Sequence, residues 1–383
     1  MRQLFLKILL ISLISFFFFS GISTASNLIT KAKQAIVLDF LTNTVLYEKD
    51  ADATMYPASM TKIMTSLLIF EGLKDGSLHL DDKMYVSEKA WREREGSSMF
   101  VMVDTYIRLE DLIRGIVIQS GNDACIVVAE NLSGSEDSFV ELMNERAREI
   151  GMRNTNYANA TGMPDPNHRT TARDVALLSS YLIKNYPKFY HFFSETDFTW
   201  EDIKQGNRNP LLYMNVGVDG LKTGHTKKSG YGLAASGIKN DRRIIFVING
   251  LKSSKERSIE SLSVINWAYR EFKNIQISHK SRTLGEAEVW LGREKKVSLV
   301  PKIDYFYTLR KSSKQNLKIK IVYEGPVPAP IEKGQEIASL QIIESDKIVF
   351  ELPLYAKNSV AKLGFFQRIS SAFNYLIWGS ENI

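Results

Sequence analysis

The pattern of apolar and polar residues predicts an α+β region followed by an all-β region. Between residues 27 and about 275, strand-like runs come first, helical patterns follow, and strand-like runs return before a last helix. This order is typical of a domain in which both ends of the chain contribute to one sheet and the middle forms a helical cluster. We therefore predict one α+β domain with an antiparallel sheet over residues 26–275.

Local signals set the expected elements of this domain. Two apolar-rich runs predict a β-hairpin, and three glycine-punctuated runs later in the chain predict adjacent antiparallel strands. Apolar residues at helical spacing, with capping residues at the ends, predict the helices. The expected strands are 34–40, 44–48, 218–224, 230–236 and 242–249; the expected helices are 63–70 ended by Gly72, 108–117, one from Asn122 or Asp123, 135–151, 175–184 opened by the capping box Thr171–Asp174, and 257–272.

After residue 273 the pattern changes to short strands separated by turn residues, with no helical spacing. Such a run is typical of a small all-β unit. We predict a β-sandwich domain over residues 276–356. Its expected strands are 287–291, 296–300, 305–309, 317–323, 337–343 and 347–352.

The tail, residues 357–383, has the pattern of an amphipathic helix. Its apolar face carries Phe366, Ile369, Phe373, Leu376 and Ile377. An apolar stripe with aromatic residues near the end and basic residues beside it is typical of a helix that lies in a membrane interface. We predict a membrane anchor; the alternative is a helix docked on the protein itself or on a partner.

The N-terminus carries the signals of export. Arg2 and Lys7 precede the apolar run Ile8–Phe19, and small residues follow it. This order predicts a signal peptide, residues 1–25, cleaved after Ala25. The alternative is an uncleaved anchor, although the run is short for a membrane span of about 20 residues.

Composition adds three exclusions. The chain has 383 residues, 44% of them hydrophobic, and a formal charge of +6 without a basic–aromatic stripe, so a nucleic-acid partner is not expected. Cys125 is the only cysteine, so no disulfide within the chain is possible, and its apolar surroundings predict a buried small hydrophobe. The five histidines show no ligand spacing, so we expect no metal and no cofactor.

The first candidate catalytic motif is Ser59-Met60-Thr61-Lys62, and Pro57 before it predicts that a helix starts here. Positions three apart share a helix face, so Ser59 and Lys62 should lie side by side. A serine needs a base to become a nucleophile, and a lysine is a base only when burial or a nearby cation keeps it neutral. The motif alone is weak, because Ser236-Gly237-Ile238-Lys239 also fits it, in a strand-like context that we interpret as structural.

Context makes the first motif specific. Ser59-Met60-Thr61-Lys62 opens a helix, Ser120-Gly121-Asn122 lies in a turn between helices, and Lys222-Thr223-Gly224 lies on a strand. These three motifs, in this order, are those of β-lactamases and penicillin-binding proteins.

The chain resembles the low-molecular-mass penicillin-binding proteins, specifically the D-alanyl-D-alanine carboxypeptidases, over nearly its whole mature length. The resemblance implies a β-lactamase/transpeptidase-like domain, followed by the small all-β domain and the amphipathic tail. The stretches that carry it are Tyr56–Lys62, Ser120–Ala124, Gly151–Thr155, Thr171–Asp174 and Val218–Thr226.

The resemblance implies a serine acylation cycle. Ser59 would attack the carbonyl between two D-alanines, Lys62 would act as general base, and Ser120 would relay a proton to the leaving D-alanine. The backbone N–H groups of Ser59 and His225 would form an oxyanion hole. β-Lactams would acylate Ser59 and leave slowly.

The resemblance also implies the substrate-binding residues. Asn122 would hold the substrate backbone, Lys222 would supply positive charge, and Thr223 would bond the substrate carboxylate, with Gly224 and His225 beside it. Arg257 has two interpretations, a residue near that carboxylate or a solvated helix start. Arg208 is a possible structural or site-rim residue.

The expected function is therefore a serine D-Ala-D-Ala carboxypeptidase acting on peptidoglycan stem peptides in the bacterial envelope or periplasm, peripheral on the outer face of the inner membrane. Three alternatives stay open. A β-lactamase would need a group that activates the deacylating water, and no such motif is present. An endopeptidase would cut cross-links with the same site, but would not need the C-terminal third. A catalytically idle wall-binding protein would not need three intact motifs.

Overall fold

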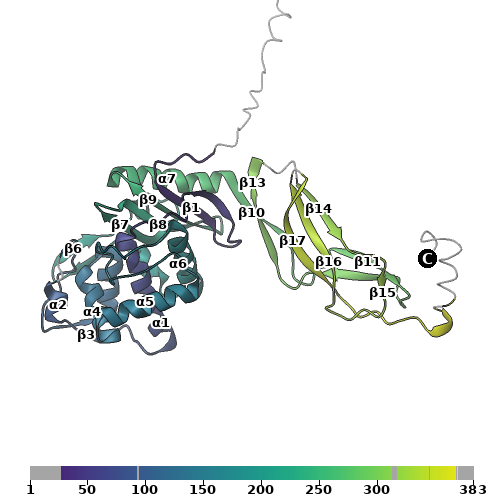
Figure 1. Cartoon of the computed structure of the whole chain (residues 1–383), viewed down its shortest axis with the longest axis horizontal. Helices are drawn as coiled ribbons and strands as arrows, with labels where there is room; N and C mark the ends of the chain where they lie inside the picture. Colours follow the sequence, from purple (N-terminus) through teal and green to yellow (C-terminus); the bar gives the residue numbers. More distant parts are fainter. Residues whose placement is uncertain (1–26, 93–94, 313–316, 345, 368, 370–383) are drawn as a thin grey trace, which may run out of the picture.

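The computed structural model describes residues 27–92, 95–312, 317–344, 346–367 and 369. These residues form two domains that follow one another along the long axis of the molecule (Figure 1). The predicted signal peptide lies outside the described residues.

The first domain is built on a five-stranded antiparallel sheet whose strands come from both ends of the domain, as predicted. The strand order is β2-β1-β9-β8-β7. The N-terminal hairpin thus pairs with strands that lie some 200 residues later, for example Ile36 opposite Val247. The strands are β1 (Gln34–Asp39), β2 (Val45–Lys49), β7 (Val218–Thr226), β8 (Gly230–Lys239) and β9 (Arg242–Leu251).

Both faces of this sheet are covered, because side chains of a strand alternate between its faces. On β9, Ile245 and Val247 pack into the helical cluster, whereas Ile244, Phe246 and Ile248 pack under helix α7 (Ser254–Glu271). The middle of the central strand, Ile244–Ile248, is therefore apolar on both faces, and the helical cluster packs against one of them.

The helical cluster contains six further α-helices, and α1 runs through its centre. Phe70 of α1 stacks on Phe189 at 5.5 Å between ring centroids. Predicted caps are in place: Thr171 accepts a hydrogen bond from the Asp174 backbone at the start of α6, and Ser135 caps α5. The helices are α1 (Lys62–Asp75), α2 (Glu88–Arg92), α3 (Leu109–Arg114), α4 (Asn122–Ser133), α5 (Glu136–Ile150) and α6 (Ala172–Asn185).

Short elements connect these helices. Two small antiparallel hairpins, β3-β4 and β5-β6, lie outside the main sheet. The short helices and strands are the 3₁₀ turns η1 (Ala58–Thr61), η3 (Tyr190–Ser194) and η4 (Pro210–Tyr213), the π-helical turn η2 (Gly115–Gln119), and β3 (Lys83–Tyr85), β4 (Tyr106–Arg108), β5 (Asp197–Trp200) and β6 (Ile203–Gly206).

Two predicted helix ends are wrong. Helix α1 does not end at Gly72 but continues to Asp75, and Gly76 at φ 85° is its C-cap. Gly72 is instead a packing residue, since a Cβ there would come within 2.6 Å of the Leu78 side chain. The helix predicted over 108–117 is α-helical only to Arg114 and then widens into the π-helical turn η2.

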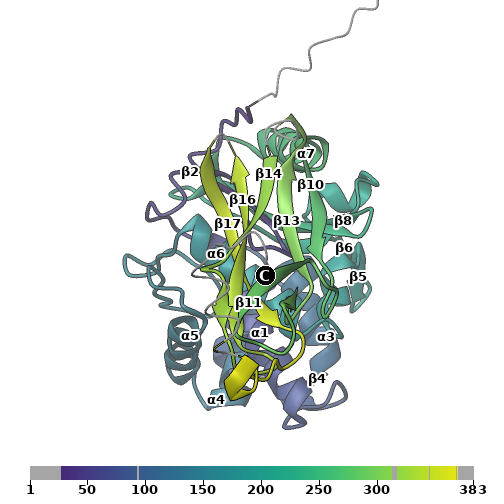
Figure 2. The same ribbon diagram turned by 90° about the vertical axis from the view of Figure 1, so that its right-hand side faces the viewer.

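The second domain is all-β, as predicted. Its six expected strands are present, and Figure 2 shows the long strands β16 and β17 in front of the first domain. A six-stranded sheet, β14-β16-β17-β12-β11-β15, accompanies the pair β10-β13. The strands are β10 (Phe272–Ser278), β11 (Gly285–Trp290), β12 (Lys296–Val300), β13 (Tyr305–Arg310), β14 (Leu317–Val322), β15 (Val327–Pro328), β16 (Glu336–Glu344) and β17 (Lys347–Ala356).

The predicted boundary at residue 276 is too late. Helix α7 ends at Glu271 and passes directly into β10, which starts at Phe272. Strands β10 and β15 were not predicted, because β10 is mixed in polarity and β15 has only two residues, too few to show a period.

The tail prediction is corrected in part. Residues 357–364 are not helical; Val360 is buried and pairs with Ile331, and Lys362 pairs with Gly292. This segment therefore belongs to the β-domain, at the end remote from the first domain (Figure 1). Most of the predicted anchor, residues 370–383, lies outside the described residues. In the described part of the chain, no helix has the length and apolarity needed to cross a membrane.

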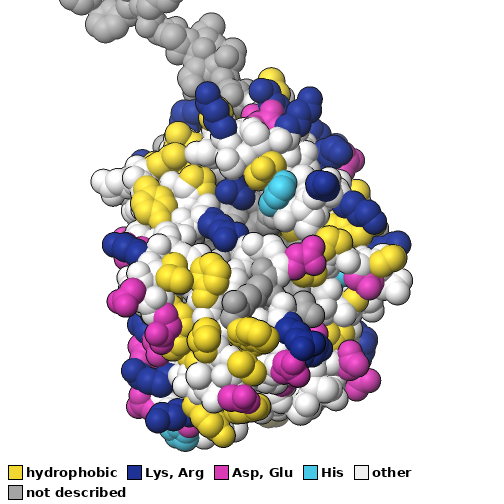
Figure 3. All heavy atoms as spheres, turned by 90° about the vertical axis from the view of Figure 1, so that its left-hand side faces the viewer, with side chains coloured by type: hydrophobic (Ala, Val, Ile, Leu, Met, Phe, Trp, Pro, Cys, Tyr) yellow, Lys and Arg dark blue, Asp and Glu magenta, His cyan; other side chains and the backbone are white. Residues whose placement is uncertain are grey.

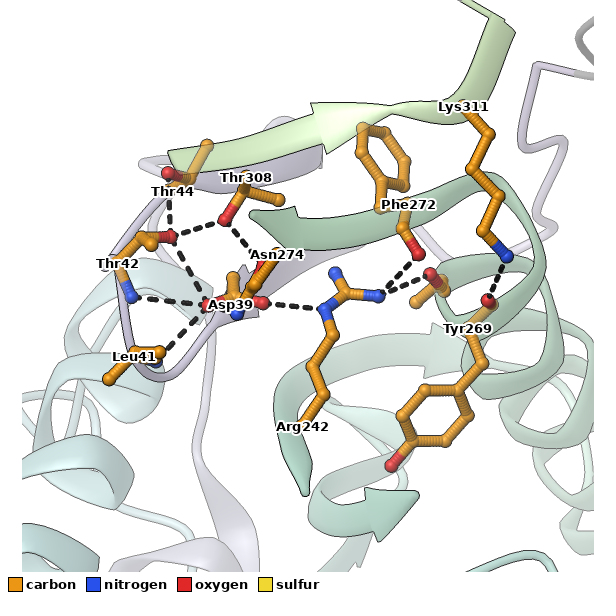
Figure 4. Close-up of polar contacts among 11 residues, drawn as sticks. Asp39, Leu41, Thr42, Thr44, Arg242, Tyr269, Phe272, Asn274, Thr308 and Lys311 are labelled. Atoms are coloured by element: carbon orange, nitrogen blue, oxygen red, sulfur yellow. Dashed lines mark hydrogen bonds and ion pairs between the residues drawn. The ribbon is translucent and has the colours of Figure 1, made fainter. Parts of the chain in front are cut away.

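A buried polar network fastens the two domains together (Figure 4). Asp39, at the end of β1, accepts hydrogen bonds from Arg242 at 2.7 Å and from Asn274 of β10 at 3.0 Å. Thr42, in the β1–β2 turn, bonds Thr308 of β13. Asp39 is fully buried and Arg242 is its one ion-pair partner among the described residues, so the loss of Arg242 would leave a costly buried charge without a cation.

Candidate active site

Ser59 and Lys62 lie side by side, as the motif predicts. Ser59 is in the 3₁₀ turn η1, and Lys62 is the first residue of α1. The Lys62 Nζ lies 3.4 Å from the Ser59 Oγ. It also donates to Asn122 Oδ1 at 2.7 Å and to the carbonyl of Thr161 at 2.6 Å. These two acceptors hold the Lys62 amino group next to the Ser59 hydroxyl.

The surroundings of Lys62 favour its neutral form. The side chain is completely buried, and this burial lowers its pKa. Arg208 lowers the pKa further, whereas Cys125 and Asp123 raise it. A lysine with a lowered pKa can accept a proton from a neighbouring hydroxyl.

Ser120 and Asn122 reach the site from the turn between η2 and α4. Ser120 has φ 64°, a left-handed conformation that ends the π-helical turn, and its buried Oγ has no hydrogen-bond partner among the described residues. Asn122 accepts from Lys62 and donates its Nδ2 to the carbonyl of Glu95 at 2.7 Å. The turn thus supplies a fixed amide that contacts Lys62 and a buried hydroxyl that has no partner among the described residues.

Asp123, considered from the sequence only as a helix cap, is a buried anchor behind this turn. Its carboxylate accepts from the Ser98 hydroxyl at 2.6 Å and from the backbone N–H groups of Met99, Phe100 and Val101. It therefore fixes segment 98–101 beside the site. The sequence signal for this role was an acidic residue directly after the Ser120-Gly121-Asn122 motif.

A second missed feature is the turn that presents the Thr161 carbonyl to Lys62. Asn159 Oδ1 accepts from the backbone N–H groups of Thr161, Gly162 and Met163. Gly162 has φ 86°, and a Cβ there would come within 2.0 Å of the Ala58 carbonyl. Only glycine lets this turn approach the serine so closely.

Strand β7 forms the opposite wall and carries the third motif. Lys222 and Thr223 are buried, and the pKa of Lys222 is lowered well below its usual value by burial and then by Lys62, Arg208 and Arg257. At Gly224, a Cβ would come within 2.7 Å of the Pro57 carbonyl. The strand therefore packs directly against the turn that holds Ser59.

Arg257 belongs to this wall, so its interpretation as a solvated helix start is wrong. It is only 8% exposed, although it lies in the first turns of α7. It donates to the carbonyl of Arg208 at 3.3 Å and lies 5.7 Å from the ring centroid of Tyr231. Burial lowers its pKa to about 10. On the other side, Tyr231 stacks on His225 with ring centroids 3.8 Å apart.

Arg208 lies at the rim and links the two walls. Its guanidinium donates to the Ser97 hydroxyl at 2.5 Å, and its carbonyl accepts from Arg257. Because its charge lowers the pKa of both Lys62 and Lys222, it acts on the site electrostatically.

His168 supports the serine turn from behind. It accepts from the Ala158 N–H at Nδ1, so the ring proton is on Nε2 and donates to the Thr61 hydroxyl at 2.8 Å. Burial lowers its pKa to about 4, so the ring is neutral near pH 7. Sequence reasoning missed this contact because the two residues are 107 positions apart.

Other candidate groups stay outside the chemistry. Cys125 is buried, as predicted, and burial raises its pKa to about 12. Ser236, from the second Ser-x-x-Lys match, lies within strand β8 and bonds Arg243. Across the described ranges, no group of three or more His, Cys, Asp or Glu side chains is placed to hold a metal ion.

Comparisons with known proteins agree with this geometry. A family model described as D-alanyl-D-alanine carboxypeptidase matches residues 22–253, and one described as penicillin-binding protein 5, C-terminal domain, matches residues 272–362. The D-alanyl-D-alanine carboxypeptidase DacA of Haemophilus influenzae is 34% identical over 343 residues, which cover 88% of this chain and 87% of DacA.

Solved structures show the same fold. Penicillin-binding protein 5 from Haemophilus influenzae superimposes with a TM-score of 0.79 at 33% identity, covering 88% of this chain and 99% of that one. Penicillin-binding protein D2 from Listeria monocytogenes, in its ampicillin-bound form, gives a TM-score of 0.58 at 27% identity, covering 64% of this chain and all of that one. The three motifs, their geometry and these matches together show that the chain belongs to the D-alanyl-D-alanine carboxypeptidase family of penicillin-binding proteins.

Proposed function

We propose that this protein is a serine carboxypeptidase that removes the terminal D-alanine from the pentapeptide stems of peptidoglycan. The observation that carries the proposal is the pairing of Ser59 Oγ with Lys62 Nζ at 3.4 Å, in a site where both Lys62 and Lys222 are buried and have lowered pKa values. This is the arrangement that a serine nucleophile with a lysine base requires.

Acylation would begin when Lys62 takes the hydroxyl proton of Ser59. The Ser59 oxygen attacks the carbonyl carbon between the two D-alanines, and the negative charge on the carbonyl oxygen is stabilised by the backbone N–H groups of Ser59 and His225. The C–N bond then breaks, and the proton held by Lys62 is relayed through the Ser120 hydroxyl to the departing amine. The unpartnered Ser120 hydroxyl supports this role.

The substrate carboxylate would lie against β7. Thr223 and Lys222 offer hydrogen-bond donors, while Arg208 and Arg257 supply positive charge; within the described residues neither arginine has an ion-pair partner. Asn122 holds the substrate backbone. A terminal carboxylate beside these donors and two arginines would favour the end of a peptide as substrate.

Water would then hydrolyse the acyl ester and return Ser59 to its free form. A β-lactam would acylate the same serine and leave slowly, because its ring-opened product remains attached to the ester. We further propose that the protein acts in the cell envelope after export, and that residues 370–383 contact the membrane surface.

The decisive experiment measures free D-alanine released from diacetyl-L-Lys-D-Ala-D-Ala by the protein from Ser26 onward, with Ser59→Ala as the control. We expect release by the wild type alone, together with a mass increase at Ser59 after exposure to penicillin. Penicillin acylation without D-alanine release would contradict a carboxypeptidase and favour an endopeptidase, which a cross-linked dimer substrate would identify. Rapid hydrolysis of penicillin would indicate a β-lactamase, and no acylation would indicate an idle wall-binding protein.

A further inference from the structure

A second pocket, rich in lysine, adjoins the active site at the end of β7. It has a volume of about 700 Å³. His225 and Thr226 of β7, Tyr231 of β8 and the segment Gly250–Lys252 form its walls, and the N-terminal segment that carries Lys31 and Lys33 closes it. His225 and Tyr231 are shared with the wall that contacts Arg257, so the pocket is continuous with the substrate-binding side of the site.

The pocket is strongly positive. Five lysines line it, and Glu256 is its one carboxylate. Glu256 is already engaged, with Lys31 at 3.6 Å and with the backbone N–H of Lys252 at 2.7 Å. The four lysines without an ion-pair partner in the described part of the chain are Lys33, Lys227, Lys228 and Lys252.

Figure 3 shows the side of the first domain that lies at the left of Figure 1, the side toward which β7 is placed. Lys and Arg side chains gather over its upper half, whereas Asp and Glu side chains are concentrated lower down. Four lysines without ion-pair partners around one pocket give it a positive electrostatic potential, and their like charges repel one another. A bound anion would relieve that repulsion.

The backbone that carries these lysines is held in place. The β7–β8 turn is closed by reciprocal hydrogen bonds, from the Thr226 N–H to the Ser229 Oγ at 2.8 Å and from the Ser229 N–H to the Thr226 Oγ1 at 3.0 Å. The side-chain stem of Lys33 packs on Gly250, where a Cβ would come within 2.7 Å of it. The pocket is therefore built on backbone held by hydrogen bonds and packing, and it carries exposed lysine side chains.

We propose that this pocket is an anion-binding subsite that takes the carboxylates of a peptidoglycan strand next to the stem being cleaved. The inference rests on the proposed function, which places a peptide stem on β7. Lysine ammonium groups act as flexible point charges and do not require the fixed geometry of a single bidentate anion. They suit a polymer that carries several separated carboxylates.

An anionic membrane is the competing partner, and its position is less favourable. The described end of the tail lies at the far end of the β-domain, whereas the pocket belongs to the first domain at the opposite end (Figure 1). A protein anchored by its tail would thus hold the pocket away from that membrane and toward the wall.

The test compares two substrates on one variant. Lys33→Gln, Lys227→Gln and Lys252→Gln are combined, since none of these residues has a role in the proposed chemistry. We expect kcat/KM for D-alanine release from soluble uncross-linked pentapeptide strands to fall about tenfold, and that for diacetyl-L-Lys-D-Ala-D-Ala to change less than about twofold, because exposed charge contacts are individually weak but act together. Added salt should reduce the wild-type rate on strands in the same way.

The matched control combines three exposed lysines away from the pocket, Lys83→Gln, Lys184→Gln and Lys320→Gln. It removes the same charge and should leave both rates unchanged. The binding arm measures cosedimentation of the Ser59→Ala protein, with and without the pocket substitutions, with intact insoluble peptidoglycan and with vesicles of 30% phosphatidylglycerol.

The outcomes separate the two proposals. Equal rates of wild type and variant on strands, equal losses on both substrates, or a binding loss confined to vesicles would each overturn the subsite. If the wild type releases no D-alanine from either substrate, the proposed function fails. The subsite is then decided by whether the pocket substitutions weaken binding to peptidoglycan.

Discussion

The two domains differ in what their interiors contain. The first domain buries charged side chains, whereas the core of the β-domain is apolar. Among the described residues beyond 276, the buried polar side chains are Ser278 and Thr308, both near the domain junction. Those buried in the first domain include Asp39, Lys62, Asp123, His168, Asp174, Lys222, Arg242, Arg257 and Glu260.

This difference indicates that the first domain is less stable than an apolar core would make it, because its site contains buried ionisable groups. Burying a charge is costly unless a partner compensates it. Asp39 has Arg242 and Asp123 has five hydrogen-bond donors, so their costs are offset. Lys62 and Lys222 have no carboxylate within 4 Å in the described chain, and the remaining cost appears as lowered pKa values.

The largest expected effect follows from removing Lys62, one of these two buried lysines. Lys62→Met should lower kcat/KM on the short peptide at least about a thousandfold, because the base is lost. The Tm should change by only a few degrees, since relief from desolvation offsets the lost hydrogen bonds to Asn122 and Thr161. Steady-state kinetics and calorimetry test both statements.

Lys74→Met is the control for this change, because Lys74 is exposed near the end of the same helix. It should leave the rate unchanged. A large fall in Tm for Lys62→Met would contradict the idea that the buried lysine is costly to the fold.

The next largest effect is expected on the stability of the β-domain. Leu354→Ala, at a fully buried position of β17, should lower the free energy of unfolding of the β-domain by about 2–5 kcal/mol. Hydrolysis of the short peptide should stay within about twofold of wild type, because none of the proposed catalytic residues lies there. Denaturant unfolding measures the first quantity.

Ile319→Ala provides the comparison, since Ile319 is an exposed residue of the same domain and should cost little stability. A parallel loss of short-peptide activity in Leu354→Ala would mean that the β-domain supports the active site itself.

A smaller effect on stability is expected from changing Asp123, a buried charge that hydrogen bonds compensate. Asp123→Asn should lower stability by about 1–3 kcal/mol, because the amide nitrogen cannot accept the hydrogen bonds that the carboxylate accepts. Asp123 also raises the pKa of Lys62, so its loss should lower that pKa and move the acid limb of the pH–kcat/KM profile to lower pH. Asp137→Asn, on the surface, is the control for the charge.

The smallest effect is expected at Arg208, and it shifts the pKa of Lys62 in the opposite direction. Arg208 lowers the pKa of Lys62, so Arg208→Gln should raise it and move the acid limb to higher pH. At neutral pH less neutral base would be present, and the rate should fall several-fold. Exposed Arg148→Gln should leave the profile unchanged; a limb that moves to lower pH in Arg208→Gln would refute the electrostatic role.

The sequence alone determined the parts that depend on local spacing. The pairing of Ser59 with Lys62 follows from a three-residue separation at a helix start, and the Thr171 cap follows from residue type and position. Apolar runs separated by glycine and turn residues were sufficient to predict the antiparallel sheet and six of the β-domain strands.

Only the tertiary structure decided the contacts that join distant segments. The carbonyl of Thr161 lies 99 positions from Lys62, and segment 98–101 meets Asp123 across more than 20 positions. The sequence allowed Arg257 to be either a residue near the substrate carboxylate or a solvated helix start, and its contacts with Arg208 and Tyr231 in the folded protein exclude the second. The physical reason is that burial and charge environment depend on which surfaces pack together, and local patterns carry no record of those partners.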